Sequence, residues 1–171
     1  MRHKTDLIKY EIYSYVNHLT NLFLNALPPF TRTFFYKILF QQFGKGSSID
    51  YGCYFRYFNK ISIGSNVEIN RGFKVFPSYK IKDAQVIISD NVKIAPEVTV
   101  FGAGQSSKNL EDVASTVVIG KNSYIGGGTI IRYGTTIGQD SVIAAGSVVF
   151  RDIPGNMTHI EKRESRLYPR E

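Results

Sequence analysis

Residues 119–148 read IGKNSY IGGGTI IRYGTT IGQDSV IAAGSV, five consecutive blocks of six residues. A large aliphatic residue opens each block, and a small hydroxylic residue follows four positions later. The aliphatic positions are Ile119, Ile125, Ile131, Ile137 and Ile143, continued by Val149, and the hydroxylic positions are Ser123, Thr129, Thr135, Ser141 and Ser147. A period of six fits neither the 3.6 of a helix nor the 2 of a strand. It indicates a solenoid.

The same period extends upstream. It passes through Ile63, Ile69, Val75 and Ile81, then through Ile88, Ile94 and Val100, with a fainter section at Phe43, Ile49 and Phe55 two residues out of phase. We interpret each coil as three flat faces, with the aliphatic residue pointing inward and stacking on its counterpart one coil away. Gly, Asn and Asp, which follow the aliphatic positions, suit the corners. The prediction is an all-β solenoid of parallel strands; an ordinary β-sandwich with chance spacing is the alternative.

The ends of the chain differ from the repeat. Residues 6–27 carry apolar side chains at helical spacing, and "LPPF" then ends the helix. We predict three regions: an N-terminal helical and aromatic cap over 1–42, the coil over 43–153, and a tail over 154–171. The alternative for the N-terminal region is a face for the membrane surface, because residues 1–45 hold more basic than acidic residues beside many aromatic ones.

Composition limits the function classes. The 171 residues carry a formal charge of +7, which suits phosphorylated small molecules or an anionic membrane surface. The basic residues are scattered and form no nucleic-acid motif, so we expect no nucleic-acid partner. A single cysteine fits a reducing compartment, and no run of 18 apolar residues exists. We therefore expect a cytoplasmic protein, with a peripheral position at the inner membrane face as the alternative.

The period breaks most strongly at 102–116, GAGQSSKNLEDVAST. A polar loop ejected from a regular solenoid costs little entropy, and such loops often carry function. A smaller break adds one residue between Ile81 and Ile88. The sequence therefore predicts that the functional residues gather around the loop 102–116.

The block PEVTVFGAGQ…VVIGKNSYIGGGTIIRYGTTIGQDSVIAAGSVVFRDIPGN resembles the left-handed β-helix hexapeptide-repeat acyltransferases. The nearest branch resembles the maltose and galactoside acetyltransferases, together with the O-acetyltransferases of bacterial surface polysaccharides. The resemblance covers roughly residues 44–156. It implies a left-handed parallel β-helix, a homotrimer, and acetyl-CoA bound along the groove between two subunits. It also implies a histidine in the ejected loop that deprotonates the acceptor hydroxyl.

The resemblance assigns roles to individual residues. Asn70 matches an asparagine that holds the acceptor near the thioester, with a corner asparagine as the alternative. Gly127 and Ala145 match small residues whose backbone contacts the pantetheine arm, although any tight corner also favours small residues. Arg151 stands where a lysine near the nucleotide end is common, and its alternative is a solvated charge.

Two features depart from the family pattern. Gln105 stands where the family carries its catalytic histidine, and the tail after residue 156 lacks the usual clasp over the cofactor. A glutamine can orient the acceptor or donate to an oxyanion, but it cannot take a proton. The candidate replacements are Glu111 and Asp112 in the ejected loop, and His159 in the tail.

These features together predict an enzyme that moves acetyl from acetyl-CoA to a sugar hydroxyl, or less readily an amine, in surface-polysaccharide biosynthesis. The acceptor would be a carbohydrate or a lipid-linked sugar. No metal is expected, because residues 44–156 contain no histidine, which also excludes the carbonic anhydrases and serine acetyltransferases built on this solenoid. The rival prediction is a catalytically impaired trimer that serves as a scaffold or regulatory protein.

Overall fold

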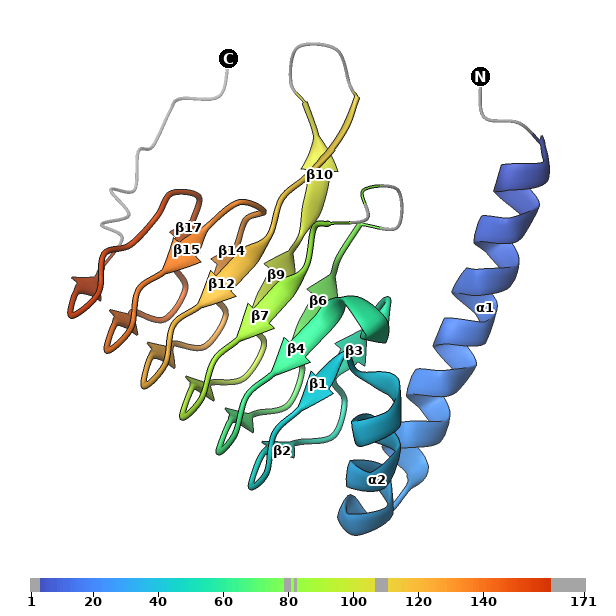
Figure 1. Ribbon diagram of the computed structural model, residues 1–171, viewed down its shortest axis with the longest axis horizontal. Coiled ribbons are helices and arrows are strands. Elements are labelled where there is room, and N and C mark those ends of the chain that lie inside the picture. Colours follow the sequence, from blue (N-terminus) through green and yellow to red (C-terminus); the bar gives the residue numbers. More distant parts are fainter. Residues whose placement is uncertain (1–3, 79–80, 82, 107–110, 161–171) are drawn as a thin grey trace, which may run out of the picture.

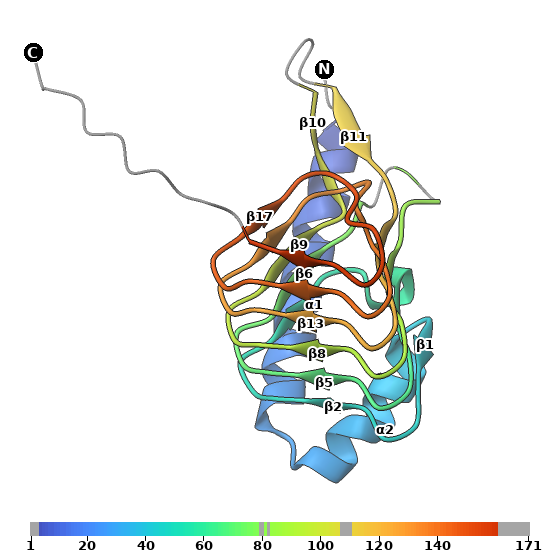
Figure 2. The same ribbon diagram turned by 90° about the vertical axis from the view of Figure 1, so that its left-hand side faces the viewer.

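The chain forms a left-handed parallel β-helix with two helices at its N-terminal end (Figure 1). The computed structural model describes residues 4–78, 81, 83–106 and 111–160, and side chains from residue 8 onward. Each coil runs through three strands, so the stacked coils form a three-sided prism (Figure 2). The predicted all-β solenoid with N-terminal helices is confirmed.

Each side of the prism is one parallel sheet, and each strand is one rung. Sheet A holds β1 (Gln42–Phe43), β4 (Ile61–Ile63), β7 (Val86–Ile88), β12 (Val117–Ile119) and β15 (Thr136–Ile137). Sheet B holds β2 (Ser48–Ile49), β5 (Glu68–Ile69), β8 (Lys93–Ile94), β13 (Tyr124–Ile125), β16 (Val142–Ile143) and β18 (Thr158–His159). Sheet C holds β3 (Tyr54–Phe55), β6 (Lys74–Phe76), β9 (Thr99–Phe101), β14 (Ile130–Ile131) and β17 (Val148–Val149). The chain passes from A to B to C, so we name the corners AB, BC and CA.

The core of the prism consists of the aliphatic residues that define the period. Ile119 pairs with Ile137, and Ile125 pairs with Ile143, each eighteen residues further along the chain. These side chains are fully buried, as are the small hydroxylic residues of the same blocks. The predicted stacking is therefore confirmed, and each coil buries its apolar residues only against its neighbours.

The AB corner is held by a ladder of polar side chains. Asn66 donates to Asn91, Asn91 donates to Asn122, and Asn122 donates to Asp140, over 3.2, 3.0 and 2.9 Å. All four residues have φ between 56° and 59°, a left-handed conformation that Asn and Asp tolerate better than other side chains. The repeated Asn and Asp of the sequence thus fix one corner of the coil.

Helix α2 (Pro29–Leu39) closes the N-terminal end of the coil with aromatic side chains. Tyr36 and Phe40 are buried, and the ring of Phe40 packs edge-on against Phe55 at 5.0 Å. Phe58, from the 3₁₀ turn Phe58–Lys60, lies 5.1 Å from the same Phe40 ring. This aromatic layer covers apolar surface that the first coil would otherwise expose.

Helix α1 (Lys4–Ala26) lies along the free edge of β3, where it takes the place of a neighbouring strand. The Asn21 amide accepts from the N–H of Phe55 and donates to its carbonyl, both at 3.0 Å. Asn25 accepts from the N–H of Gly52 at 2.9 Å. The side chains that bond this edge are spaced four apart on one helix face: Tyr13, Asn17, Asn21 and Asn25. They satisfy backbone groups that an uncovered edge strand would leave open.

The coil extends further than the predicted boundary at 153. Thr158 and His159 form β18, which pairs in parallel with β16, so residues up to 159 still belong to sheet B. The ejected segment also has regular structure: β10 (Ala103–Gln105) and β11 (Asp112–Ala114) form an antiparallel hairpin that projects from the CA corner (Figure 1). Residues 107–110 of that segment and 161–171 of the predicted tail lie outside the described residues.

Candidate functional site

Three of the predicted site residues lie along one edge of the prism, the BC corner. Asn70 follows the inward Ile69 of β5, while Gly127 and Ala145 stand two positions after the inward residues of β13 and β16. Because β5, β8, β13 and β16 are consecutive rungs in register, Asn70 lies two rungs before Gly127 and three before Ala145. The structure brings these three residues to a common edge.

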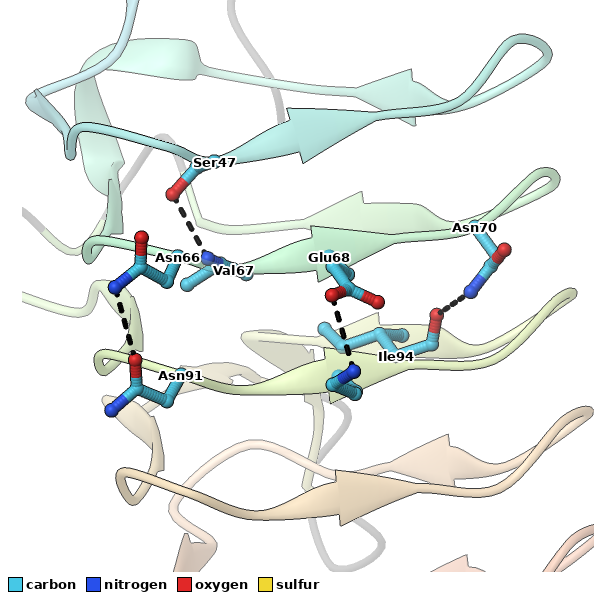
Figure 3. A network of polar contacts seen from close by, with 8 residues as sticks. Ser47, Asn66, Val67, Glu68, Asn70, Asn91 and Ile94 are labelled. Carbon is cyan, nitrogen blue, oxygen red and sulfur yellow. Dashed lines mark hydrogen bonds and ion pairs between the residues drawn. The ribbon is translucent and has the colours of Figure 1, made fainter.

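Asn70 is exposed, and its side-chain amide donates to the carbonyl of Ile94 on the next rung at 2.9 Å (Figure 3). It does not belong to the asparagine ladder of the AB corner, which contains Asn66 and Asn91. The bond to Ile94 uses the NH₂ group, so the amide oxygen is oriented away from that carbonyl and can accept from a hydroxyl. This geometry suits a residue that positions an alcohol.

At Gly127 and Ala145 the BC corner carries no side chain larger than a methyl group. A Cβ atom added at Gly127 would come within 3.2 Å of the Pro96 carbonyl oxygen, which already accepts from the N–H of Gly128. Gly146 donates to the Gly127 carbonyl at 2.8 Å, so the backbone ladder continues through the corner. An extended chain could lie along this edge close to the backbone, because side chains there are absent or small.

A pocket of about 370 Å³ opens beside Asn70, at the N-terminal end of sheet B. It is lined by Pro29, Arg32, Ser48, Ile49, Asp50, Tyr51, Glu68, Ile69 and Asn70. Arg32 is only 3% exposed; its guanidinium donates to the Ile49 carbonyl and lies 4.0 Å from the Tyr51 ring centroid. Its Nη1 atom has no hydrogen-bond partner among the described residues. Sequence reasoning missed this pocket, because its lining comes from three separate segments.

The second edge of interest is the CA corner, which carries the hairpin β10–β11. Gln105 is exposed and pairs directly with Asp112 across the two strands. Directly paired residues have Cβ atoms about 4.5–5.5 Å apart and point to the same face. The carboxylate of Asp112 therefore lies beside the position that the resemblance gives to the catalytic histidine.

The other candidate bases are placed differently. The Glu111 carbonyl accepts from the N–H of Ser106 at 2.9 Å, and strand alternation directs its side chain away from the face of Asp112. His159 pairs with the buried Ile143, so its ring points into the last rung, and its Nε2 atom is buried with no partner in the described part of the chain. Within one chain, the structure brings Glu111 and Asp112 to Gln105 and keeps His159 apart.

A tyrosine supports the hairpin from the following rung. A Cβ atom added at Gly104 would lie 2.5 Å from Cε1 of Tyr133, so the ring packs directly on the backbone before Gln105. Arg132 donates to the Tyr133 hydroxyl at 2.6 Å. The sequence signal was the glycine of the "GQ" pair, which leaves room for this ring.

Arg151 lies on the CA corner, beyond β17, and is exposed. The hairpin leaves the same corner beyond β9, two rungs earlier in sheet C. Arg151 is therefore on the hairpin's edge and not on the edge of Gly127 and Ala145. Within one chain the predicted residues other than His159 divide between two edges that are separated by the full width of sheet C.

Other reactive groups do not add to either edge. Burial raises the pKa of the Cys53 thiol to about 11, so it is protonated at neutral pH and is a poor nucleophile. Among the described residues, no cluster of three or more His, Cys, Asp or Glu side chains could hold a metal ion. The same part of the chain contains no helix long and apolar enough to cross a membrane.

Known proteins share both the repeat and the coil. The family described as "Bacterial transferase hexapeptide (six repeats)" matches residues 116–151. Galactoside O-acetyltransferase of Escherichia coli is 37% identical over 126 residues, which are 71% of this chain and 60% of that protein. This chain therefore spans less than two thirds of that relative.

Two solved structures extend the match. A galactoside acetyltransferase in complex with coenzyme A is 32% identical, with a TM-score of 0.75, and the alignment covers 86% of this chain and 76% of the other. A hexapeptide-repeat acetyltransferase of Vibrio cholerae, complexed with acetyl coenzyme A, has a TM-score of 0.77 at 26% identity and covers 88% and 82%. The chain thus belongs to the hexapeptide-repeat acetyltransferase family.

Proposed function

We propose that the protein is an acetyltransferase that moves acetyl from acetyl-CoA to a sugar hydroxyl. The observation that carries this proposal is the hairpin β10–β11, which presents Gln105 and Asp112 side by side on the CA edge. The small-residue corner at Gly127 and Ala145 supports it, since the pantetheine arm needs a flat edge of backbone. The acetyl-CoA complex of the Vibrio cholerae relative gives further support.

The active site we propose lies between two copies of the chain. The hairpin is on the CA edge, whereas Asn70, Gly127 and Ala145 are on the BC edge. In a homotrimer with cyclic symmetry, the CA edge of one copy can face the BC edge of the next, and three equivalent grooves result. Arg151, on the hairpin's edge two rungs further along, would then meet the phosphates at the nucleotide end of the cofactor.

The chemistry requires a base and an oxyanion donor. The acceptor oxygen attacks the thioester carbon, its proton passes to the base, and the C–S bond breaks as the CoA sulfur receives that proton. We assign the base role to Asp112, because it is paired with Gln105. The Gln105 amide can donate to the developing oxyanion, and the Asn70 oxygen can accept from the acceptor hydroxyl. Glu111 and His159 are the alternatives, and an amine acceptor would need less help from a base.

The acceptor we propose is a sugar of a surface polysaccharide or of its lipid-linked precursor, modified in the cytoplasm at the inner membrane face. The pocket beside Asn70 supports a carbohydrate, because Arg32, Asp50 and Glu68 offer polar groups next to the Tyr51 ring. The name of the Escherichia coli relative, a galactoside O-acetyltransferase, also supports a sugar. The outer surface of the two helices supports the membrane position.

The second candidate is a non-catalytic trimer that acts as a scaffold or regulatory protein. The observation that favours it is Gln105, because losing a histidine base costs about 10²–10⁴ in rate. This candidate keeps the cofactor groove and predicts binding of acetyl-CoA without turnover.

An acetyl-transfer assay separates the two candidates. Purified protein is supplied with acetyl-CoA and a panel of sugars, and release of the CoA thiol is followed for the wild type and for Gln105→His. We expect sugar-dependent turnover by the wild type and a faster rate for Gln105→His. Acetyl-CoA binding without turnover in the wild type, and a gain of activity in Gln105→His alone, would instead support the scaffold.

A further inference from the structure

The solvent-facing side of helix α1 is apolar. Its exposed large apolar residues are Ile8, Ile12, Tyr15, Val16, Leu19, Leu22 and Phe23. At 100° per residue they fall within an arc of about 120°, opposite the face whose asparagines bond the coil edge. The exposed polar residues of the described helix, Lys9, Glu11 and His18, flank this arc. A helix on a soluble surface normally shows the reverse pattern.

Helix α2 continues this apolar surface. Phe30, Phe34 and Ile38, spaced four apart, are exposed on its outer side. The Phe35 ring lies 5.4 Å from Phe23 of α1 and 5.7 Å from Phe34, so the two helices share one apolar face. We call these ten exposed side chains of α1 and α2 the helical base. An exposed apolar surface shared by two helices marks an interaction surface.

The helical base points away from the coil along the coil axis. Both helices lie at the N-terminal end of the rungs (Figure 1), and in the view from the C-terminal side of the coil α1 lies behind the rungs (Figure 2). The proposed trimer uses the long edges of the prism, so it leaves this end surface open. In a trimer whose threefold axis is parallel to the coils, the three helical bases face the same direction. They can bind one surface together, which raises the overall affinity above that of a single helical base.

We propose that the helical base docks on an anionic lipid bilayer, with α1 lying in the plane of the headgroups. Charge favours this partner: two exposed lysines, Lys9 and Lys37, border the apolar residues against one acidic residue, Glu11, and the chain carries a net charge of +7. Neither described helix can cross a membrane, so the contact is at the surface. A second trimer packed base to base is the competing occupant, and the test below separates it.

The docked orientation has a consequence for the acceptor, which rests on the proposed acetyl transfer. The hairpin leaves the third rung of sheet C, two rungs beyond β3 and the helices that cover it. Two rung spacings and one helix diameter place Gln105 about 20 Å from the headgroups. A lipid-linked glycan acetylated there presents a sugar some distance from its lipid, and not the sugar attached directly to it.

Vesicle co-sedimentation tests the docking without acetyl-CoA or acceptor. The vesicles are phosphatidylcholine alone, or phosphatidylcholine with phosphatidylglycerol. The base variant carries Ile12→Ser, Leu19→Ser and Phe34→Ser, at positions 43–61% exposed. The control carries Tyr124→Ser, Val142→Ser and Phe150→Ser, at positions 42–58% exposed on the coil. Circular dichroism and sedimentation velocity report folding and oligomeric state.

We expect the wild type and the control variant to bind the anionic vesicles, and the base variant to bind at least tenfold more weakly. High salt should also weaken binding. If the wild type does not bind vesicles, the proposal is wrong. If the wild type is a hexamer and the substitutions in the helical base convert it to trimers, the helical base binds a second trimer instead. Equal vesicle binding by wild type and base variant also overturns it. Vesicle binding by a protein without transferase activity would contradict only the proposed function, and activity without vesicle binding only the docking.

Discussion

Two corners of the same prism differ in structure: one is a regular ladder, and the other carries the hairpin that we propose for the chemistry. The AB corner repeats the same side-chain hydrogen bond from rung to rung, along Asn66, Asn91, Asn122 and Asp140. At the CA corner the repeat is interrupted after β9 by a hairpin, and the ring of Tyr133 packs against its backbone. Substitutions in the coil should therefore lower stability, and substitutions in the hairpin should lower activity with little effect on stability.

The largest effect is expected in the hairpin. Asp112→Asn keeps the shape of the side chain but removes the proposed base, so kcat should fall by about 10²–10⁴. The midpoint of urea unfolding should hardly change, because the side chain is exposed. Glu111→Gln, one residue away on the other face, is the matched control and should retain most activity. Equal losses in both variants would show that the hairpin's overall charge matters, and not the position of one carboxylate.

The next effect belongs to the coil. Ile131 is fully buried between rungs, so Ile131→Ala should lower the free energy of unfolding by about 2–5 kcal/mol. Its neighbour Ile130 points outward on the same strand, and Ile130→Ala should cost less than half as much. Urea titration at fixed protein concentration measures both. Similar costs at the two positions would contradict the inward stacking of the period.

A smaller effect is expected at the AB corner. Asn91→Ala removes two ladder bonds and places alanine at a φ of 58°, at a cost of about 1–2 kcal/mol. Asn91→Gly tolerates that φ, so the difference between the two variants measures the conformational part. If the two variants lower the stability equally in thermal unfolding, the loss of the ladder bonds alone explains the cost of replacing Asn91.

The smallest effect is expected at the exposed ion pair of Glu68 and Lys93, 3.1 Å apart. Glu68→Gln should change the unfolding free energy by less than about 1 kcal/mol, and salt should remove the difference. The pair of Lys74 and Glu97, also 3.1 Å apart, supplies the control Glu97→Gln. Since Glu68 lines the pocket beside Asn70, only Glu68→Gln should raise the KM for the sugar. Equal KM values in the two variants would show that the pocket is not part of the acceptor site.

The sequence predicted the regular part of the fold because one buried position recurs in each block of six. Ile119 and Ile137 could be paired from the printed letters alone. For the hairpin, the sequence predicted only its position in the chain. The pairing of Gln105 with Asp112 could not be predicted, because it depends on a turn that no repeat specifies. The sequence therefore offered Asp112 only as one of three equal candidates for the base.

Other features escaped the sequence analysis for physical reasons. The asparagines of α1 look like ordinary polar residues of an amphipathic helix until the edge of β3 lies beside them. His159 resembled a residue of a free tail, whereas β18 adds a further rung and turns its ring inward. The buried Arg32 follows no motif, because its surroundings come from α2 and two coils. Each depends on contacts between segments far apart in the chain.

Subunit complementation tests the central proposal, a site shared between two copies, most directly. Asn70→Ala and Asp112→Asn chains are each inactive in this proposal, and are unfolded together and refolded as mixed trimers. Random mixing in equal amounts restores both residues in about a quarter of the grooves, so the mixture should recover about a quarter of the wild-type rate. A mixture no more active than the separate variants would contradict the shared site and place both residues in one chain's own groove.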